Sequence, residues 1–250
     1  MNDQLSLRRL GFVVRSDLMR IYRSVLLISG TAALVALAVS LAGAYDGDVG
    51  QGPLFYRAFF TATLFAWGTI ATSVCFSDLH GRATNTAFLL LPASALEKTA
   101  SRLLICTVGL IAYLLLLTTL LSWVLEGINT LWIDERRGFF SPLDELSWPL
   151  LPHFLVAQAL FFLGAAWFRK VWWIKTVGAV IGIVIGLGAV AAGLLWMVGP
   201  MQCLNADCYQ VPLFDGLSAA APVAYFYLLP PFCWFVAWLR VSEAQVSHGV

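Results

Sequence analysis

Six long apolar stretches dominate the sequence and restrict what the chain can fold into. A membrane-spanning helix needs about 20 mainly apolar residues. The stretches that reach this length are 24–44, 54–76, 103–125, 150–168, 176–198 and 217–239. The segments between them are short and leave no room for a separate soluble domain. We therefore expect an all-α, polytopic membrane protein whose six transmembrane helices occupy residues 24–239.

The composition points to the same class. Charged residues make up 12% of the chain and hydrophobic residues 60%, whereas soluble domains carry roughly 25% charged residues to cover their surface. The mean hydropathy is +0.83. The formal net charge of +1 also argues against a strongly basic nucleic-acid-binding protein.

The charges are divided unequally between the two sides of the membrane. With six spans, both termini lie on one side. That side carries twelve basic and five acidic residues, and the other carries three basic and nine acidic residues. Because loops rich in Lys and Arg stay in the cytoplasm, we expect both termini to be cytoplasmic, with residues 240–250 as a short tail.

Residues 1–23 form a basic segment before the first span. Leu7, Leu10, Val14, Leu18 and Ile21 follow one another at steps of three and four, which places them on one face of a helix. With arginines on the flanks, the pattern predicts an amphipathic helix in the cytoplasmic membrane interface. A segment that only sets the topology through its positive charge would have the same composition, so that alternative stays open.

The cytoplasmic segment 77–102 is long for a simple turn. Ser94 and Glu97 have the spacing of a capping box, in which each side chain accepts a hydrogen bond from the backbone N–H of the other. The spacing predicts a helix that starts at Ser94 and continues into the third span, after a short helix over 84–91 that ends at Pro92. A partner could bind this segment, although an ordinary connecting loop can carry the same box.

Ionisable side chains are almost absent from the predicted spans. His153, in the fourth span with Gln158, is interpreted as a structural or interfacial residue. The lack of carboxylates near the midplane argues against an ion-driven transporter. No Gly-x-x-x-x-Gly-Lys-Ser/Thr loop is present, so we do not expect the chain to hydrolyse ATP. No catalytic residue or metal site is predicted.

The cysteines fall into two groups. Cys203 and Cys208 lie in the outer segment before the last span, where an oxidising compartment would allow a disulfide; two free thiols are the alternative. Cys75, Cys106 and Cys233 lie in or at the ends of spans and are interpreted as small apolar fillers.

The fifth span carries glycines at steps of four. Gly178, Gly182 and Gly186 form a small-xxx-small repeat, which lets another helix approach closely. The partner is either another span of this chain or a second subunit, so the face could be the seam of a homodimer or heterodimer.

These features together resemble the membrane permease subunit of a type-2 ATP-binding-cassette (ABC) exporter. The shared features are a basic N-terminal helix, six spans with both ends inside, an extended loop after the second span and no nucleotide site. Residues 88–98, FLLLPASALEK, resemble the Leu-Pro-x-Ser-x-x-Glu-Lys pattern of small bacterial permease-like proteins. One departure is the short segment before the last span, where the family often has re-entrant helices. A break at Pro222 or Pro230 would restore a short outer helix.

The resemblance implies a protein of the bacterial inner membrane that works with other subunits. Two permease copies or paralogues would pair, and separate ATP-binding subunits would bind ATP and Mg²⁺, so this chain needs no cofactor of its own. The cargo would be a hydrophobic or amphipathic peptide, lipid or antibiotic. The residues expected to contact the ATP-binding subunit are Asp78, His80, Arg82, Phe88, Glu97 and Lys98.

Two other classes of function remain open. The first is a non-transporting membrane scaffold or immunity protein that binds a partner or a peptide. The second is a membrane enzyme that uses the carboxylates of the outer segment 126–148, which include Asp134, Glu135, Asp144 and Glu145. We expect no enzymatic activity, because acids in a solvated loop usually serve solubility alone.

Overall fold

The computed structural model of this chain describes residues 6–45, 52–80, 93–133, 138–141, 148–169, 171–202 and 220–248. Its elements are α1 (Leu7–Tyr45), α2 (Gly52–Val74), α3 (Ser77–His80), α5 (Ala95–Leu104), η2 (Ile105–Gly109), α6 (Leu110–Ile133), α7 (Leu150–Trp167), α8 (Trp172–Gln202), η3 (Ala224–Leu228) and α10 (Leu229–His248). Six helical stretches in these ranges are long and apolar enough to cross a membrane. The predicted all-α, six-helix class is confirmed.

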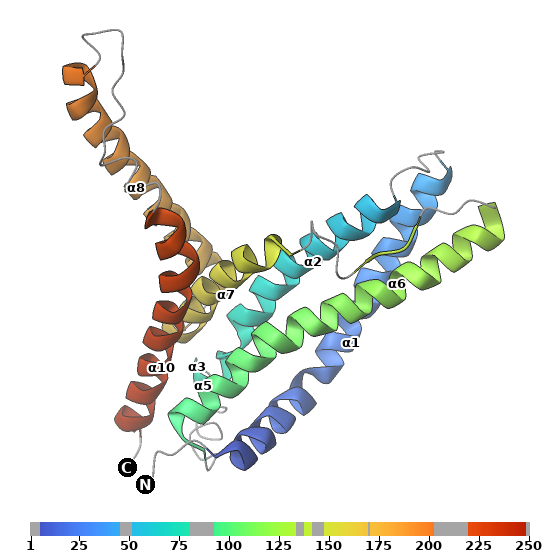
Figure 1. Cartoon of the computed structure of the whole chain (residues 1–250). Coiled ribbons are helices and arrows are strands. Elements are labelled where there is room, and N and C mark those ends of the chain that lie inside the picture. The colour runs from blue at the N-terminus through green and yellow to red at the C-terminus, as the bar shows by residue number, and fades with distance from the viewer. Residues whose placement is uncertain are drawn as a thin grey trace.

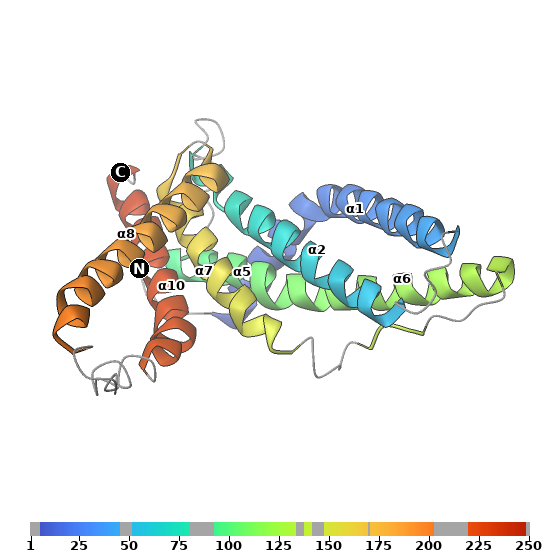
Figure 2. The ribbon, with the colours of Figure 1, turned by 90° about the horizontal axis from the view of Figure 1, so that it is seen from above.

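The helices form two diverging arms joined by α7 (Figure 1). α1, α2 and α6 run together in one arm, α8 and α10 form the other, and the view from above shows the same division (Figure 2). α7 packs against α2 on one side and against α8 and α10 on the other. The starts of α1 and α5 and the end of α10 lie at one end of the molecule, called here the terminal end. The opposite end of the α1, α2 and α6 arm is called the far end.

Two apolar clusters hold the arms to α7. Phe154 of α7 lies fully buried in a cluster with Phe60, Leu64 and Leu125 of the first arm. Phe162, two turns further along α7, lies fully buried in a cluster with Phe76 and with residues of α10. Because both clusters share α7, this helix fixes the position of each arm at its base.

α1 runs without interruption through the boundary that the sequence placed between residues 23 and 24. No proline stands near this boundary, so nothing in the local sequence ends the helix. At 1.5 Å per residue, its length is about 58 Å, well beyond the roughly 30 Å of a bilayer core. The amphipathic segment is helical as predicted, and it forms the first part of a longer helix that also contains the first span.

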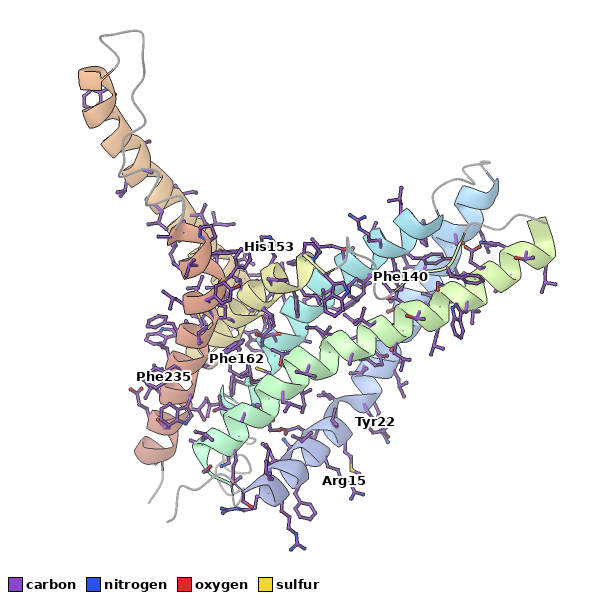
Figure 3. All side chains as sticks on the ribbon, viewed as in Figure 1. Arg15, Tyr22, Phe140, His153, Phe162 and Phe235 are labelled. Atoms are coloured by element: carbon purple, nitrogen blue, oxygen red, sulfur yellow. The ribbon has the colours of Figure 1, made fainter. Side chains whose placement is uncertain are left out.

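The apolar stripe of this first part of α1 faces away from the other helices. Leu7 and Leu18 of the predicted stripe are 79% and 48% exposed. Figure 3 shows Arg15 and Tyr22 on the same outward side. A water-soluble helix would turn this stripe towards the core. An outward apolar stripe beside arginines is typical of a helix at a membrane surface.

The last span stays helical through its prolines. Residues 220–248 are helical throughout, and η3 within them has π geometry, with the Leu229 N–H donating to the Ala224 carbonyl oxygen five residues back. Pro230 and Pro231 follow directly; both lack an N–H, and their rings crowd the preceding turn. The wider π turn accommodates them without the break that the sequence suggested at Pro222 or Pro230.

Candidate functional site

The predicted capping box is present at the start of α5. The Glu97 N–H donates to Ser94 Oγ at 3.2 Å, and the Ser94 N–H donates to Glu97 Oε2 at 3.0 Å. This pair satisfies N–H groups that have no partner within the helix. The box therefore fixes where the third membrane helix begins, as the sequence predicted.

The Glu97 carboxylate also binds the start of α1. Its Oε1 accepts a hydrogen bond from the Ser6 N–H at 2.9 Å, and Arg9 Nε lies 3.5 Å from the same oxygen. Ser6 directly precedes α1, so one fully buried carboxylate serves the N-terminal ends of two helices. Its negative charge is also favourable there because of the helix dipoles.

Asp78 forms a second junction at the terminal end. Its Oδ2 accepts hydrogen bonds from Arg20 at 3.0 Å and from Arg102 at 3.2 Å. The Arg102 guanidinium also donates to the Cys75 carbonyl oxygen and lies over the Phe76 ring, 5.2 Å from its centroid. Arg102 is 5% exposed, and a charge so buried needs partners of this kind.

A third contact completes the terminal-end network. Ser101 Oγ donates to Asp17 Oδ2 at 2.9 Å. With the two junctions above, the polar side of α1 is bound to α3 and α5 along about three turns. We call this set the terminal-end network; its members are Arg9, Asp17, Arg20, Asp78, Glu97, Ser101 and Arg102.

The predicted coupling residues are only partly brought together. Glu97 and Lys98 are 0% and 1% exposed, so the expectation that their side chains touch a partner subunit directly is wrong for this structure; they lie inside the helical packing. Asp78 belongs to the network with about a quarter of its side chain exposed. Arg82, Phe88 and the side chain of His80 lie outside the described part of the chain.

A polar cluster that the sequence analysis missed lies at the far end. Tyr56 Oη donates to Glu126 Oε1 at 2.9 Å, and Asn129 Nδ2 donates to Ser40 Oγ at 3.2 Å. Glu126 was counted as an outer-loop acid, and this was wrong because α6 continues to Ile133. The signal was present in the sequence, since Glu126 and Asn129 are three residues apart and share a helix face.

The outer segment after α6 returns to the helices. Phe140 is 5% exposed, and its ring centroid lies 5.7 Å from that of Phe60 on α2. Its N–H donates to Ser122 Oγ of α6 at 3.4 Å, and Figure 3 places Phe140 between these two helices. Non-helical backbone at membrane depth is tolerated when protein surrounds it in this way. The four acids proposed for an outer-face enzyme, at 134, 135, 144 and 145, lie outside the described ranges.

The glycine face of α8 is open. A methyl group added at Gly178, Gly182 or Gly186 would meet no atom within 4 Å. The described residues therefore show no packing of another span onto this face, and the seam of a dimer stays a prediction. The disulfide expected between Cys203 and Cys208 falls outside the described residues.

Close helix packing instead occurs at two other glycines. A methyl group at Gly68 of α2 would lie 2.8 Å from Phe154 Cζ, and one at Gly164 of α7 would lie 2.9 Å from Thr176 Cβ of α8. Both distances are far below van der Waals contact, so α7 approaches its neighbours through missing side chains. These isolated glycines carry no repeat that the sequence analysis could have used.

The two polar residues predicted in the fourth span have different surroundings. His153 packs edge to face against Phe226, with ring centroids 4.9 Å apart. Gln158 is fully buried at the middle of α7, where its Oε1 accepts a hydrogen bond from Trp234 Nε1 of α10 at 3.2 Å. Gln158 thus joins α7 to the second arm.

Comparison with protein-family models, with curated proteins and with solved structures found no match to this chain. The sequence resemblance to an exporter permease therefore rests on the topology and on the motif at residues 88–98. The geometry adds one element that bears on function, which is the terminal-end network on both sides of residues 81–92.

Proposed function

We propose that this chain is the membrane permease subunit of an ATP-driven exporter in the bacterial inner membrane, with ATP hydrolysed by a separate subunit at the terminal end. One observation carries the proposal. The segment 81–92 leaves α3 and re-enters at α5, and both points belong to the terminal-end network through Asp78 and Glu97. A partner that moved this segment would therefore move α1, α3 and α5 together.

The network gives the proposed coupling a physical form. Asp78 and Glu97 each bind residues of α1 and of the α5 region, so the three elements cannot shift separately without exposing buried charge. Arg82 and Phe88 remain the proposed contacts with the ATP-binding subunit. Glu97 acts in this proposal as a positioning residue, and Lys98 has no proposed contact with the partner.

The surroundings of the spans favour a hydrophobic or amphipathic cargo. At mid-span, the described polar groups are hydroxyl groups such as that of Thr118 and the amide of Gln158, both at most 1% exposed. Neutral groups of this kind suit a cargo that enters from lipid. In the proposal, a second permease copy or a paralogue covers the open face of α8 and completes the transport path.

Purification from native membranes tests the proposal. A tagged chain should carry an ATP-binding subunit with it, and Arg82→Ala combined with Phe88→Ala should reduce the recovered amount at least severalfold. Membrane insertion and thermal unfolding should be unchanged, because these substitutions leave the terminal-end network intact. Arg240→Ala is the matched control, since Arg240 is an exposed base at the same end that pairs with Glu243.

Two results would refute the proposal. One is a purified chain without any ATP-binding subunit, together with vesicle ATP hydrolysis that does not depend on the amount of this chain. The other is full recovery of the partner by the double variant. A stable complex with a protein that binds no nucleotide would instead support the scaffold function.

A further inference from the structure

Two cysteines at the terminal end lie in contact although 30 residues separate them in the sequence. The thiol groups of Cys75 and Cys106 are within hydrogen-bonding contact of each other. Cys75 is half-buried and Cys106 is 7% exposed. Such a contact goes beyond the filler role that the sequence analysis gave these residues.

Both cysteines occupy places where the helix is irregular. Cys75 is in the turn after α2, and its N–H donates to the Thr72 carbonyl oxygen three residues back, as at a helix end. Cys106 lies in the π turn η2, where the Leu110 N–H reaches back to the Ile105 carbonyl oxygen. π turns inside α-helices are frequent at functional sites. Irregular backbone on both sides allows the small shifts that a sulfur–sulfur bond requires.

The pair stands beside the Arg102 junction. Arg102 binds the Cys75 carbonyl oxygen and Asp78, and Asp78 also binds Arg20 of α1. A covalent bond between Cys75 and Cys106 would tie the end of α2 to η2 directly next to these ion pairs. Its presence or absence would therefore set how freely α3 and α5 move relative to each other.

We propose that Cys75 and Cys106 form a reversible dithiol–disulfide pair that locks the end of α2 to η2. The more exposed Cys75 attacks a low-molecular-weight disulfide, forms a mixed disulfide and releases one thiol. Cys106 then attacks the Cys75 sulfur and releases the second thiol. Two electrons pass to the small disulfide, and the two thiol protons leave on its products.

The site does not depend on the proposed transport function, because it involves only residues of this chain. Disulfides that form on the cytoplasmic side are usually transient or redox-sensing. The ligand class is therefore a small disulfide of the glutathione type, and a cellular dithiol reductant would reverse the bond.

The test uses the full-length chain in native membrane vesicles. The vesicles are treated with oxidised glutathione, denatured, alkylated with N-ethylmaleimide and digested for mass spectrometry. A peptide pair joined through Cys75 and Cys106 should form and should disappear with dithiothreitol. Cys233, 1% exposed on α10, is the internal control, and its thiol should be lost about tenfold or more slowly.

Single variants separate the two chemical steps. Cys106→Ser should accumulate glutathione on Cys75, Cys75→Ser should leave Cys106 reduced, and Cys233→Ser should behave as the unaltered chain. The proposal is overturned if the unaltered chain gives no joined peptide while both thiols are recovered alkylated. It is also overturned if Cys75 keeps its glutathione and never bonds to Cys106. Both readouts use the unaltered chain, so a variant that fails to insert does not affect them.

Discussion

Replacing Glu97 with alanine should lower stability strongly, because this carboxylate serves two helix starts. The substitution removes the capping box at Ser94 and leaves the Ser6 N–H without its acceptor. Loss of a cap costs about 1 kcal/mol, and a buried N–H left without a partner costs about 1–3 kcal/mol. Arg9 is half exposed, so its ion pair adds less than about 1 kcal/mol. The expected total is about 2–4 kcal/mol.

Thermal unfolding in detergent micelles, followed by tryptophan fluorescence, measures this effect. A loss of this size should lower the midpoint by roughly 5–10 °C in a chain of this length. Glu97→Gln keeps one acceptor oxygen and should fall between the alanine variant and the unaltered chain. Glu243→Ala is the control, because Glu243 is an exposed acid of the same end and should shift the midpoint little.

One combination of results would refute this account of Glu97. If Glu97→Ala unfolds at the same temperature as the unaltered chain but loses its ATP-binding subunit, the side chain contacts the partner directly. The burial of Glu97 and the bond from Ser6 would then not describe the working protein.

Three further substitutions test the far end and the helix packing by the same unfolding measurement. Tyr56→Phe removes the donor to Glu126 and should cost about 1 kcal/mol; an unchanged midpoint would show that this bond contributes nothing. Phe140→Ala should cost about 1–3 kcal/mol through the cavity it leaves, and a stabilised variant would contradict its packing between helices. Gly164→Leu should cost about 1–3 kcal/mol or more by overpacking, whereas Gly182→Leu should leave the monomer unchanged and weaken cross-linking between copies; equal effects would refute the contrast in packing.

The sequence was sufficient for features that depend on neighbouring residues. The six spans follow from runs of apolar residues, and the capping box follows from Ser94 and Glu97 three positions apart. The helical nature of residues 7–23 follows from the spacing of their apolar side chains. Each of these is set within a few turns of helix, where the rules of periodicity and capping apply.

The sequence was insufficient where distant segments meet. Glu97 binds Ser6 across 91 positions, and Asp78 binds Arg20 across 58. Both acids were assigned to a partner subunit because a charge in a loop carries no mark of which other charge it will meet. The same reason hid the contact of Cys75 with Cys106.

Helix ends were the other source of error. The third span was ended at residue 125 because Glu126 is charged, although the Tyr56 hydroxyl group compensates that charge inside the bundle. The uninterrupted α8 face shows the reverse case, since the spacing of its glycines indicated close packing that the described chain does not provide.

The continuity of α1 makes this helix a lever. Arg9 is held at the terminal end by Glu97, and Ser40 is held at the far end by Asn129, about 45 Å away along one rod. A hinge between an interfacial segment and the first span would have absorbed a displacement at either end. Without one, a tilt imposed at Glu97 must reappear at Ser40, so the two sides of the membrane are mechanically connected through a single helix.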